Sequence, residues 1–132
     1  MIDLSQHYGQ GPVFLKDIAR RQDVSERYLA NIVQVLKKKG MVHSFRGVHG
    51  GYVLAKKPVD ITLKDIVCSL EKQAHLVGCV HKLRFCSRAN SCQARRVWMQ
   101  VEKCFYSALA SITLKNACKK CRMKPLRTIR KG

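Results

Sequence analysis

Apolar residues near the start of the chain recur at the three- and four-residue spacing of amphipathic helices, in two short runs. Residues 14–21 predict one helix and residues 26–39 a second, with a turn at residues 22–24 between them. Ser25 is a favourable N-cap for the second helix, and Gly40 can take the left-handed conformation that ends it. This pattern predicts a helix-turn-helix. The expected apolar faces consist of Leu15, Ile18 and Ala19 in the first helix and Tyr28, Leu29, Ile32, Val33 and Leu36 in the second.

Two β-type segments follow, separated by a glycine-rich turn. Residues 41–46 and 52–56 predict strands, and residues 47–51 (GVHGG) predict the turn of a hairpin. A helix-turn-helix followed by a β-hairpin is a winged helix. Thr62 and Asp65 then form a capping-box pattern for a helix that runs to Leu70. The predicted fold class is therefore mainly α with a small β-hairpin wing.

The second half of the chain predicts a loop and then a long helix. Residues 73–92 have no clear periodicity, so we expect a loop there. The helix is expected to begin at Gln93 and to fade near Lys119, and residues 121–132 form a basic tail. Its apolar stripe consists of Val97, Val101, Cys104, Ala108 and Ser111 or Ile112, widened by Trp98, Phe105 and Leu109.

The composition narrows the class of protein. No apolar run is long enough to cross a membrane and no signal peptide is visible, so we expect a cytoplasmic protein with no membrane partner. We find no paired acid and base, no phosphate-cradling loop and no nucleophile elbow. These absences argue against an enzyme and against a small-molecule substrate. Residues 1–8 resemble the end of an apolar helix, whose first turns we expect to be missing.

The charge balance indicates a polyanionic partner. The net charge is +18, and residues 79–132 carry fourteen basic side chains and one acidic, Glu102. Such a surface attracts DNA or RNA through counterion release. A basic surface that merely keeps the protein soluble is the less favoured alternative.

Specific residues of the predicted winged helix are candidates for DNA contact. The second helix of a helix-turn-helix enters the major groove with its N-terminal residues, which here include Ser25, Arg27 and Tyr28. Core packing explains Tyr28 equally well. In the wing, Arg46 can enter a minor groove, where the potential is most negative. The candidate DNA-binding residues are Ser25, Arg27, Tyr28, Arg46, Gly47, His49 and Gly50.

Three of the seven cysteines stand close together in the predicted loop: Cys79, Cys86 and Cys92. Thiolates hold both iron–sulfur clusters and zinc, and thiols stay reduced in the cytosol. The spacing therefore predicts a metal site, with three unrelated structural thiols as the alternative. Cys68 and Cys104 are expected to be core thiols. His75, His81 and the Cys118–Cys121 pair are weaker candidate ligands.

Six short motifs carry a resemblance to a known family: residues 15–22 (LKDIARRQ), 25–29 (SERYL), 36–40 (LKKKG), 44–47 (SFRG), 50–55 (GGYVLA) and 61–67 (ITLKDIV). With these motifs the chain resembles the Rrf2 family of bacterial winged-helix transcriptional regulators over nearly its whole length. The resemblance implies a homodimer, in which two long helices pack together and two winged helices read a near-palindromic double-stranded DNA operator. It implies residues 1–72 as the DNA-binding domain, 73–92 as the cysteine loop and 93–120 as the dimerisation helix.

The resemblance also implies an iron–sulfur cluster, of the two-iron or four-iron type, at Cys79, Cys86 and Cys92. Members with a two-iron cluster have a histidine where this chain has Arg95, which cannot ligate. The chain also has Val48 and His49 where proline and glycine are usual. The predicted function is a DNA-binding transcriptional regulator, expected to be a repressor, that senses iron, redox state or nitric oxide through a cluster. The alternatives are a regulator with zinc or free thiols, and a non-specific basic nucleic-acid-binding protein.

Overall fold

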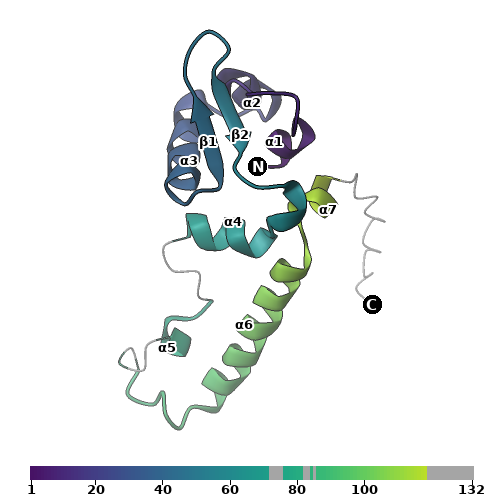
Figure 1. Cartoon of the computed structure of the whole chain (residues 1–132). Coiled ribbons are helices and arrows are strands. Elements are labelled where there is room, and N and C mark those ends of the chain that lie inside the picture. The colour runs from purple at the N-terminus through teal and green to yellow at the C-terminus, as the bar shows by residue number, and fades with distance from the viewer. Residues whose placement is uncertain (72–75, 82–83, 85, 119–132) are drawn as a thin grey trace, which may run out of the picture.

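The computed structural model of the chain describes residues 1–71, 76–81, 84 and 86–118. Three short helices and a two-stranded hairpin form a winged helix, with α4 (Leu63–Leu70) beneath it. A long helix, α6 (Gln93–Ser111), runs away from this unit, and α5 (Gly78–His81) lies beside its far end (Figure 1). This arrangement confirms the predicted fold class. Among the described residues no helix is both long and apolar enough to cross a membrane.

The helix-turn-helix forms as predicted from its local signals. Helix α1 (Ile2–Gln6) precedes it, α2 (Leu15–Arg21) is its first helix, and α3 (Glu26–Lys38) is its second. The Ser25 hydroxyl oxygen accepts the Tyr28 backbone N–H at 3.2 Å, which caps α3. Gly40 ends the helix in the left-handed region at φ +67°. One prediction is wrong: Tyr28 is 60% exposed and does not belong to the apolar face of α3.

The wing is an antiparallel pair, β1 (Val42–Phe45) and β2 (Gly51–Leu54), shorter than the predicted strands. Val13 forms an isolated antiparallel bridge to β2, since Val13 and Tyr52 exchange backbone hydrogen bonds of 3.0 and 2.9 Å. Gly51 lies against Val13 with φ +140°, and a Cβ atom at this glycine would lie 2.6 Å from the Val13 carbonyl oxygen. The position therefore requires glycine, and it fixes the wing to the segment before α2.

The hydrophobic core joins the winged helix to the end of the chain that the structure describes. Its most buried side chains are Val42, Ile61 and Leu114, and Leu114 is fully buried. Leu114 belongs to α7 (Leu114–Cys118), which packs against α1 and against the short 3-10 helix η1 (Pro58–Asp60). The full set of buried core residues is Leu4, Ile18, Val33, Leu36, Met41, Val42, Leu54, Ile61 and Leu114.

The long helix ends earlier than predicted. Helix α6 begins at Gln93 as expected but stops at Ser111, and Ile112 has an extended backbone. The Ile112 carbonyl accepts the Leu63 N–H at 2.9 Å, and the Leu114 N–H donates to the Ile61 carbonyl at 2.7 Å. This bridge satisfies backbone groups of both segments and buries Leu114. The two contributions together stabilise the chain more than further turns of α6 would.

Two further expectations change with the structure. The segment 73–92 was expected to be a loop, but it contains the four-residue helix α5. Cys68 is expected to be a core thiol, but it is exposed, and no other part of the described chain covers it. Cys104 is also exposed, on the stripe of α6 that is expected to pair with a second subunit, so its burial stays a prediction. Residues 121–132, His75 and the His81 side chain lie outside the described residues.

Candidate nucleic-acid interface and cysteine loop

The first turn of α3 presents polar side chains to solvent. Ser25, Arg27 and Tyr28 are all exposed, and Arg27 and Tyr28 stand next to each other on the helix. The hydroxyl oxygen of Ser25 is used by the cap, while its O–H can still donate. The capping hydrogen bond therefore fixes the backbone of the turn from which an arginine and a tyrosine project. Such a turn can donate hydrogen bonds to phosphates or to base edges.

The wing tip is a tight turn that exposes a cation. Arg46, Gly47 and His49 are exposed, and Gly47 takes φ +104°. Gly50, another predicted contact, is buried, and its N–H donates to the Gly47 carbonyl at 2.9 Å. A Cβ atom at Gly50 would lie 2.6 Å from the Phe45 carbonyl oxygen, so this glycine shapes the turn. Sequence reasoning missed that Val48 is 87% exposed at the same tip.

The three loop cysteines occupy different local settings. Cys79 lies on α5 and is half-buried, Cys86 is exposed, and Cys92 is half-buried at the N-cap of α6. Thiolates suit iron–sulfur clusters and zinc, so the donor chemistry fits a metal group. Within the described part of the chain, no three His, Cys, Asp or Glu side chains are grouped closely enough to hold a metal ion. The structure therefore supplies suitable donors but does not gather them.

Arg95 contacts the backbone of α5, the helix that carries Cys79. Its Nε–H donates to the Cys79 carbonyl oxygen at 2.9 Å, and its Nη2 donates to the Val80 carbonyl oxygen at 3.3 Å. These contacts join the first turn of α6 to α5. Sequence reasoning identified Arg95 only as a residue that cannot ligate. Its contact with residues fifteen and sixteen positions earlier had no signal in the sequence.

Comparison with known proteins assigns the family. A family model described as Rrf2, iron-dependent transcriptional regulator, matches residues 1–120. The chain belongs to the Rrf2 family. "Protein rrf2" of Nitratidesulfovibrio vulgaris (strain Hildenborough) is 37% identical over 129 residues, which cover 89% of this chain and 86% of that relative.

Two solved structures of Rrf2 relatives share the fold. The global cysteine regulator CymR (YrzC) of B. subtilis has a TM-score of 0.73 at 35% identity, covering 89% of this chain and 85% of CymR. T. potens IscR has a TM-score of 0.72 at 38% identity, covering 95% of this chain and 82% of IscR. This Rrf2 protein is therefore a DNA-binding transcriptional regulator and not an enzyme.

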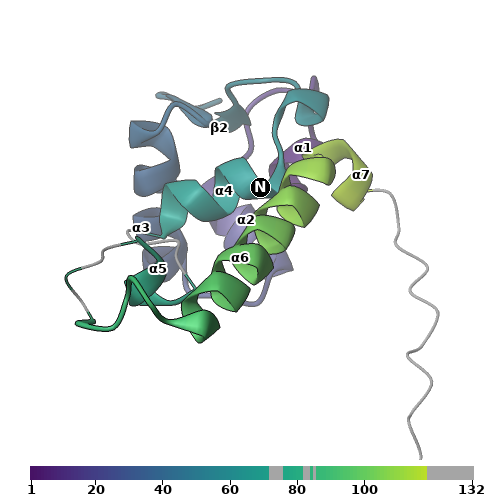
Figure 2. The ribbon, with the colours of Figure 1, turned by 90° about the horizontal axis from the view of Figure 1, so that it is seen from below.

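In this Rrf2 regulator, one face of α6 is apolar and bare. Val97 is 61% exposed, and Val101 and Phe105 are 42% and 41% exposed. With Gln100 and Cys104 they line a hollow of about 460 Å³. Helix α6 also packs against α4 (Figure 2), where Lys64 Nζ of α4 lies 5.9 Å from the centre of the Tyr106 ring, and Glu102 of α6 is buried. The predicted stripe is thus present, and nothing in the described chain covers it.

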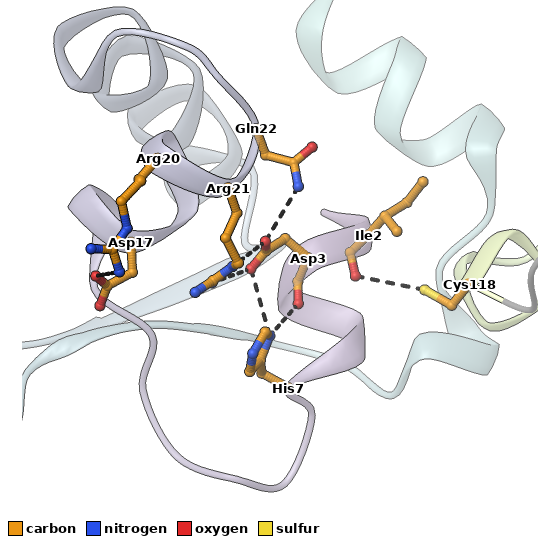
Figure 3. A network of polar contacts seen from close by, with 8 residues as sticks. All are labelled: Ile2, Asp3, His7, Asp17, Arg20, Arg21, Gln22 and Cys118. Atoms are coloured by element: carbon orange, nitrogen blue, oxygen red, sulfur yellow. Dashed lines mark hydrogen bonds and ion pairs between the residues drawn. The ribbon is translucent and has the colours of Figure 1, made fainter.

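A polar network fixes α1 against the helix-turn-helix (Figure 3). The Asp3 carboxylate accepts two hydrogen bonds from the Arg21 guanidinium and one from the Gln22 amide. The His7 ring also contacts Asp3, with Nδ1 2.8 Å from its carbonyl oxygen. These hydrogen bonds, chiefly those from Arg21, lower the pKa of Asp3 despite its burial. The network holds the end of α2, and so the turn before α3, in place.

Proposed function

We propose that this Rrf2 regulator is a cytoplasmic homodimer that reads a near-palindromic operator and senses iron or redox signals through its cysteine loop. The proposal rests on the connection between the winged helix and the segment that carries the three cysteines. A winged helix with exposed arginines is joined through α4 and α6 to a segment with three thiols. A regulator needs both a DNA-reading surface and a group whose chemistry changes, and the winged helix and the three thiols are candidates for these roles at opposite ends of α6 (Figure 1).

Arg27 and Arg46 are the residues proposed to read DNA. Arg27 on the first turn of α3 can bind a guanine edge with two hydrogen bonds in the major groove. Arg46 at the wing tip has the charge and the exposure needed to enter an adjacent minor groove. Ser25, Tyr28, Gly47 and His49 support these contacts through phosphates. Gly50 contributes by shaping the turn, since its backbone N–H is already used.

The bare face of α6 is the proposed dimer contact. Val97, Val101 and Phe105 expose apolar surface in a contiguous stripe, and burying such surface favours association. Two-fold pairing of this face would place two winged helices in one molecule. A dimer of this kind matches a palindromic operator, because the protein and the DNA then share the same symmetry.

The cysteine loop is the proposed sensor. Cys79, Cys86 and Cys92 would hold an iron–sulfur cluster, which supplies a redox-active and nitric-oxide-reactive centre when bound. The description of the family as iron-dependent supports this assignment. Cys86 is exposed and Cys79 and Cys92 are half-buried, so each thiol keeps some contact with solvent through which a metal group can be loaded. Cys79 lies on α5 and Cys92 lies at the start of α6. A change in the ligation of these cysteines would therefore act directly on both helices.

The test is anaerobic purification followed by analysis of iron, sulfide and zinc per chain, with the visible spectrum recorded. We expect iron and sulfide together, and their loss in a variant with Cys86→Ser. The same samples are then titrated with a duplex selected by the protein from a random pool. A colourless, metal-free protein with the same DNA affinity as any loaded sample contradicts cluster sensing.

A second candidate is a regulator that senses oxidants through its free thiols. The observation that favours it is the open arrangement of the cysteines, since no group of three ligands is assembled in the described residues. A relative, CymR of Staphylococcus aureus, has a solved structure of an oxidized form at 28% identity. Zinc in place of iron would indicate a third arrangement, with the Cys118–Cys121 pair as further ligands. Metal analysis distinguishes the three arrangements, because they predict iron with sulfide, no metal, and zinc.

A further inference from the structure

Arg95 makes two hydrogen bonds that connect α6 to the helix bearing Cys79. Its guanidinium donates to the Cys79 and Val80 carbonyl oxygens, at 2.9 and 3.3 Å, and the side chain is half-buried. The last carbonyl groups of any helix lack partners within it, and a helix of four residues has few others. Arg95 therefore satisfies backbone groups of α5 that would otherwise depend on water.

The same contacts hold together the two backbone segments that carry Cys79 and Cys92. Cys79 lies on α5, and Cys92 is the N-cap of α6, three residues before Arg95. The Arg95 side chain thus spans the two ends of the loop. Cys86 lies between them and is exposed. Any reaction that draws the thiols together has to move the backbone to which Arg95 is bound.

The charge of Arg95 also acts on this loop. A guanidinium stays protonated in proteins and has no lone pair to offer a metal, so Arg95 cannot be a ligand. A fixed cation near a bound cluster favours the more reduced, more negative state of that cluster. Arg95 therefore has an electrostatic effect on the loop that a neutral side chain of similar length lacks.

A continuous set of packed helices leads from this contact to the DNA-reading surface. Helix α5 packs against α6, α6 packs against α4, and α4 packs against α3. In Figure 1 α4 lies directly below the winged helix, and α6 and α5 lie farther from it. These contacts form a path of packed helices from α6, which carries Arg95, to α3, whose first turn carries Arg27.

We propose that Arg95 is the positioning residue that couples the chemical state of the cysteine loop to α6, and through it to the recognition helix α3. The inference rests on the proposed function, because it takes the loop thiols as the sensor. It adds the residue through which their state reaches the DNA-binding surface. When the thiols are ligated or modified, α5 moves, the two acceptors of Arg95 move with it, and α6 follows.

The test compares Arg95→Met, Arg95→Lys and a control, Arg96→Met, at the next and exposed position. Met removes the charge and the donors, while Lys keeps the charge and a donor. Each protein also carries serine at Cys68, Cys104, Cys118 and Cys121, so that only the loop thiols react. The loop is changed in two ways, by anaerobic reconstitution with iron and sulfide and by alkylation with N-ethylmaleimide. DNA affinity is measured before and after each treatment, on a duplex selected by the untreated protein.

We expect at least one treatment to change the affinity of the parent and of Arg96→Met by about tenfold, within the usual range of coupling between sites. Arg95→Met should change by less than about twofold, with Arg95→Lys between them, while the untreated affinities stay equal. Arg95→Met should also lower the reduction potential of any reconstituted cluster, a readout that a purely structural role would leave unchanged.

Two results overturn the inference: an equal affinity change in Arg95→Met and the parent, or no change in the parent after either treatment. If the parent takes up no iron but loses DNA affinity on alkylation, the cluster hypothesis is refuted. The coupling role of Arg95 still stands in that case, provided that the DNA affinity of Arg95→Met does not change on alkylation. Thermal melts identify a variant that fails to fold. In that case Arg95→Lys, which retains the charge, decides the question by its smaller affinity change.

Discussion

The Asp3 carboxylate accepts hydrogen bonds from the Arg21 guanidinium at 2.7 and 2.9 Å, across eighteen residues of chain. Asp3 is only 4% exposed, and Gln22 donates a third hydrogen bond to it at 3.3 Å. Arg21 ends α2 and Gln22 begins the turn to α3. The first helix of the chain therefore helps to hold the geometry of the helix-turn-helix.

Asp3→Asn should destabilise the protein by about 1–2 kcal/mol, because hydrogen bonds to a charged group are worth more than those to an amide. Urea unfolding followed by circular dichroism measures the change. Asp17→Asn is the matched control. Asp17 pairs with Arg20, which is 80% exposed, at 3.2 Å, so we expect a loss below about 0.5 kcal/mol. Equal losses in the two variants would show that the Asp3 pair contributes no more than a surface pair.

The acid sensitivity of folding should depend on the same carboxylate. The Arg21 hydrogen bonds lower the pKa of Asp3 below its value in the unfolded chain, near 3.9. The unfolded state then binds more protons, so the stabilisation is complete above about pH 4 to 5 and is lost as the pH falls through the folded-state pKa. Stability curves of the parent and Asp3→Asn should therefore converge in acid. Asp65, whose pKa is lowered by its capping box with Thr62, adds to the acid loss equally in both proteins.

Local signals were sufficient to predict the helix-turn-helix and the wing from the sequence. Ser25 caps α3, Gly40 ends it, and Thr62 and Asp65 cap α4, all through contacts within a few residues. The end of α6 was not predictable in this way, since Ile112 and Leu114 bond to Leu63 and Ile61, about fifty residues earlier. Helical spacing between Gln93 and Lys119 carries no information about that partner.

The candidate site was predictable to a similar depth. The sequence identified the three thiols and the exposed arginines, because residue type and spacing suffice for that. It did not show that Gly50 is buried or that Arg95 bonds to α5. The burial of Gly50 and the hydrogen bonds of Arg95 both depend on which earlier residues the backbone meets after a turn or loop. The gathering of Cys79, Cys86 and Cys92 around a metal is likewise a long-range property, and it stays a prediction.

Gly51→Ala should disrupt the wing, at a cost of about 2–4 kcal/mol, because a Cβ atom meets the Val13 backbone at 2.6 Å in a left-handed conformation. Gly40→Ala is the control: its φ is +67°, yet nothing lies within 4 Å of the added Cβ. We expect about 1–2 kcal/mol there from backbone strain alone. Thermal unfolding measures how much stability each of the two variants loses. A smaller loss for Gly51→Ala than for Gly40→Ala would refute the tight contact with Val13.

Arg27→Ala should weaken operator binding by about 1–3 kcal/mol and relax preference at one base pair, as expected for loss of a two-bond contact with guanine. Arg46→Ala should instead reduce preference where the minor groove is narrow. Fluorescence anisotropy on the selected duplex and on single-base variants of it distinguishes the two effects. Arg96→Ala, on α6 and exposed, removes the same charge away from the winged helix. If all three variants lose affinity equally and without change in preference, the arginines act only through charge.

Val101→Asp should convert a dimer into monomers. Val101 is 42% exposed near the middle of the bare face of α6, and a carboxylate buried there would lack a partner. Ser107→Asp adds the same charge six residues later, about 120° around the helix, where solvent can reach it. Sedimentation velocity over a range of protein concentrations should show monomers for Val101→Asp and dimers for the parent and Ser107→Asp. The monomer should also bind a single half-site much more weakly than the dimer binds the palindrome, because the second contact is lost. A dimeric Val101→Asp would place the subunit interface elsewhere than on this face.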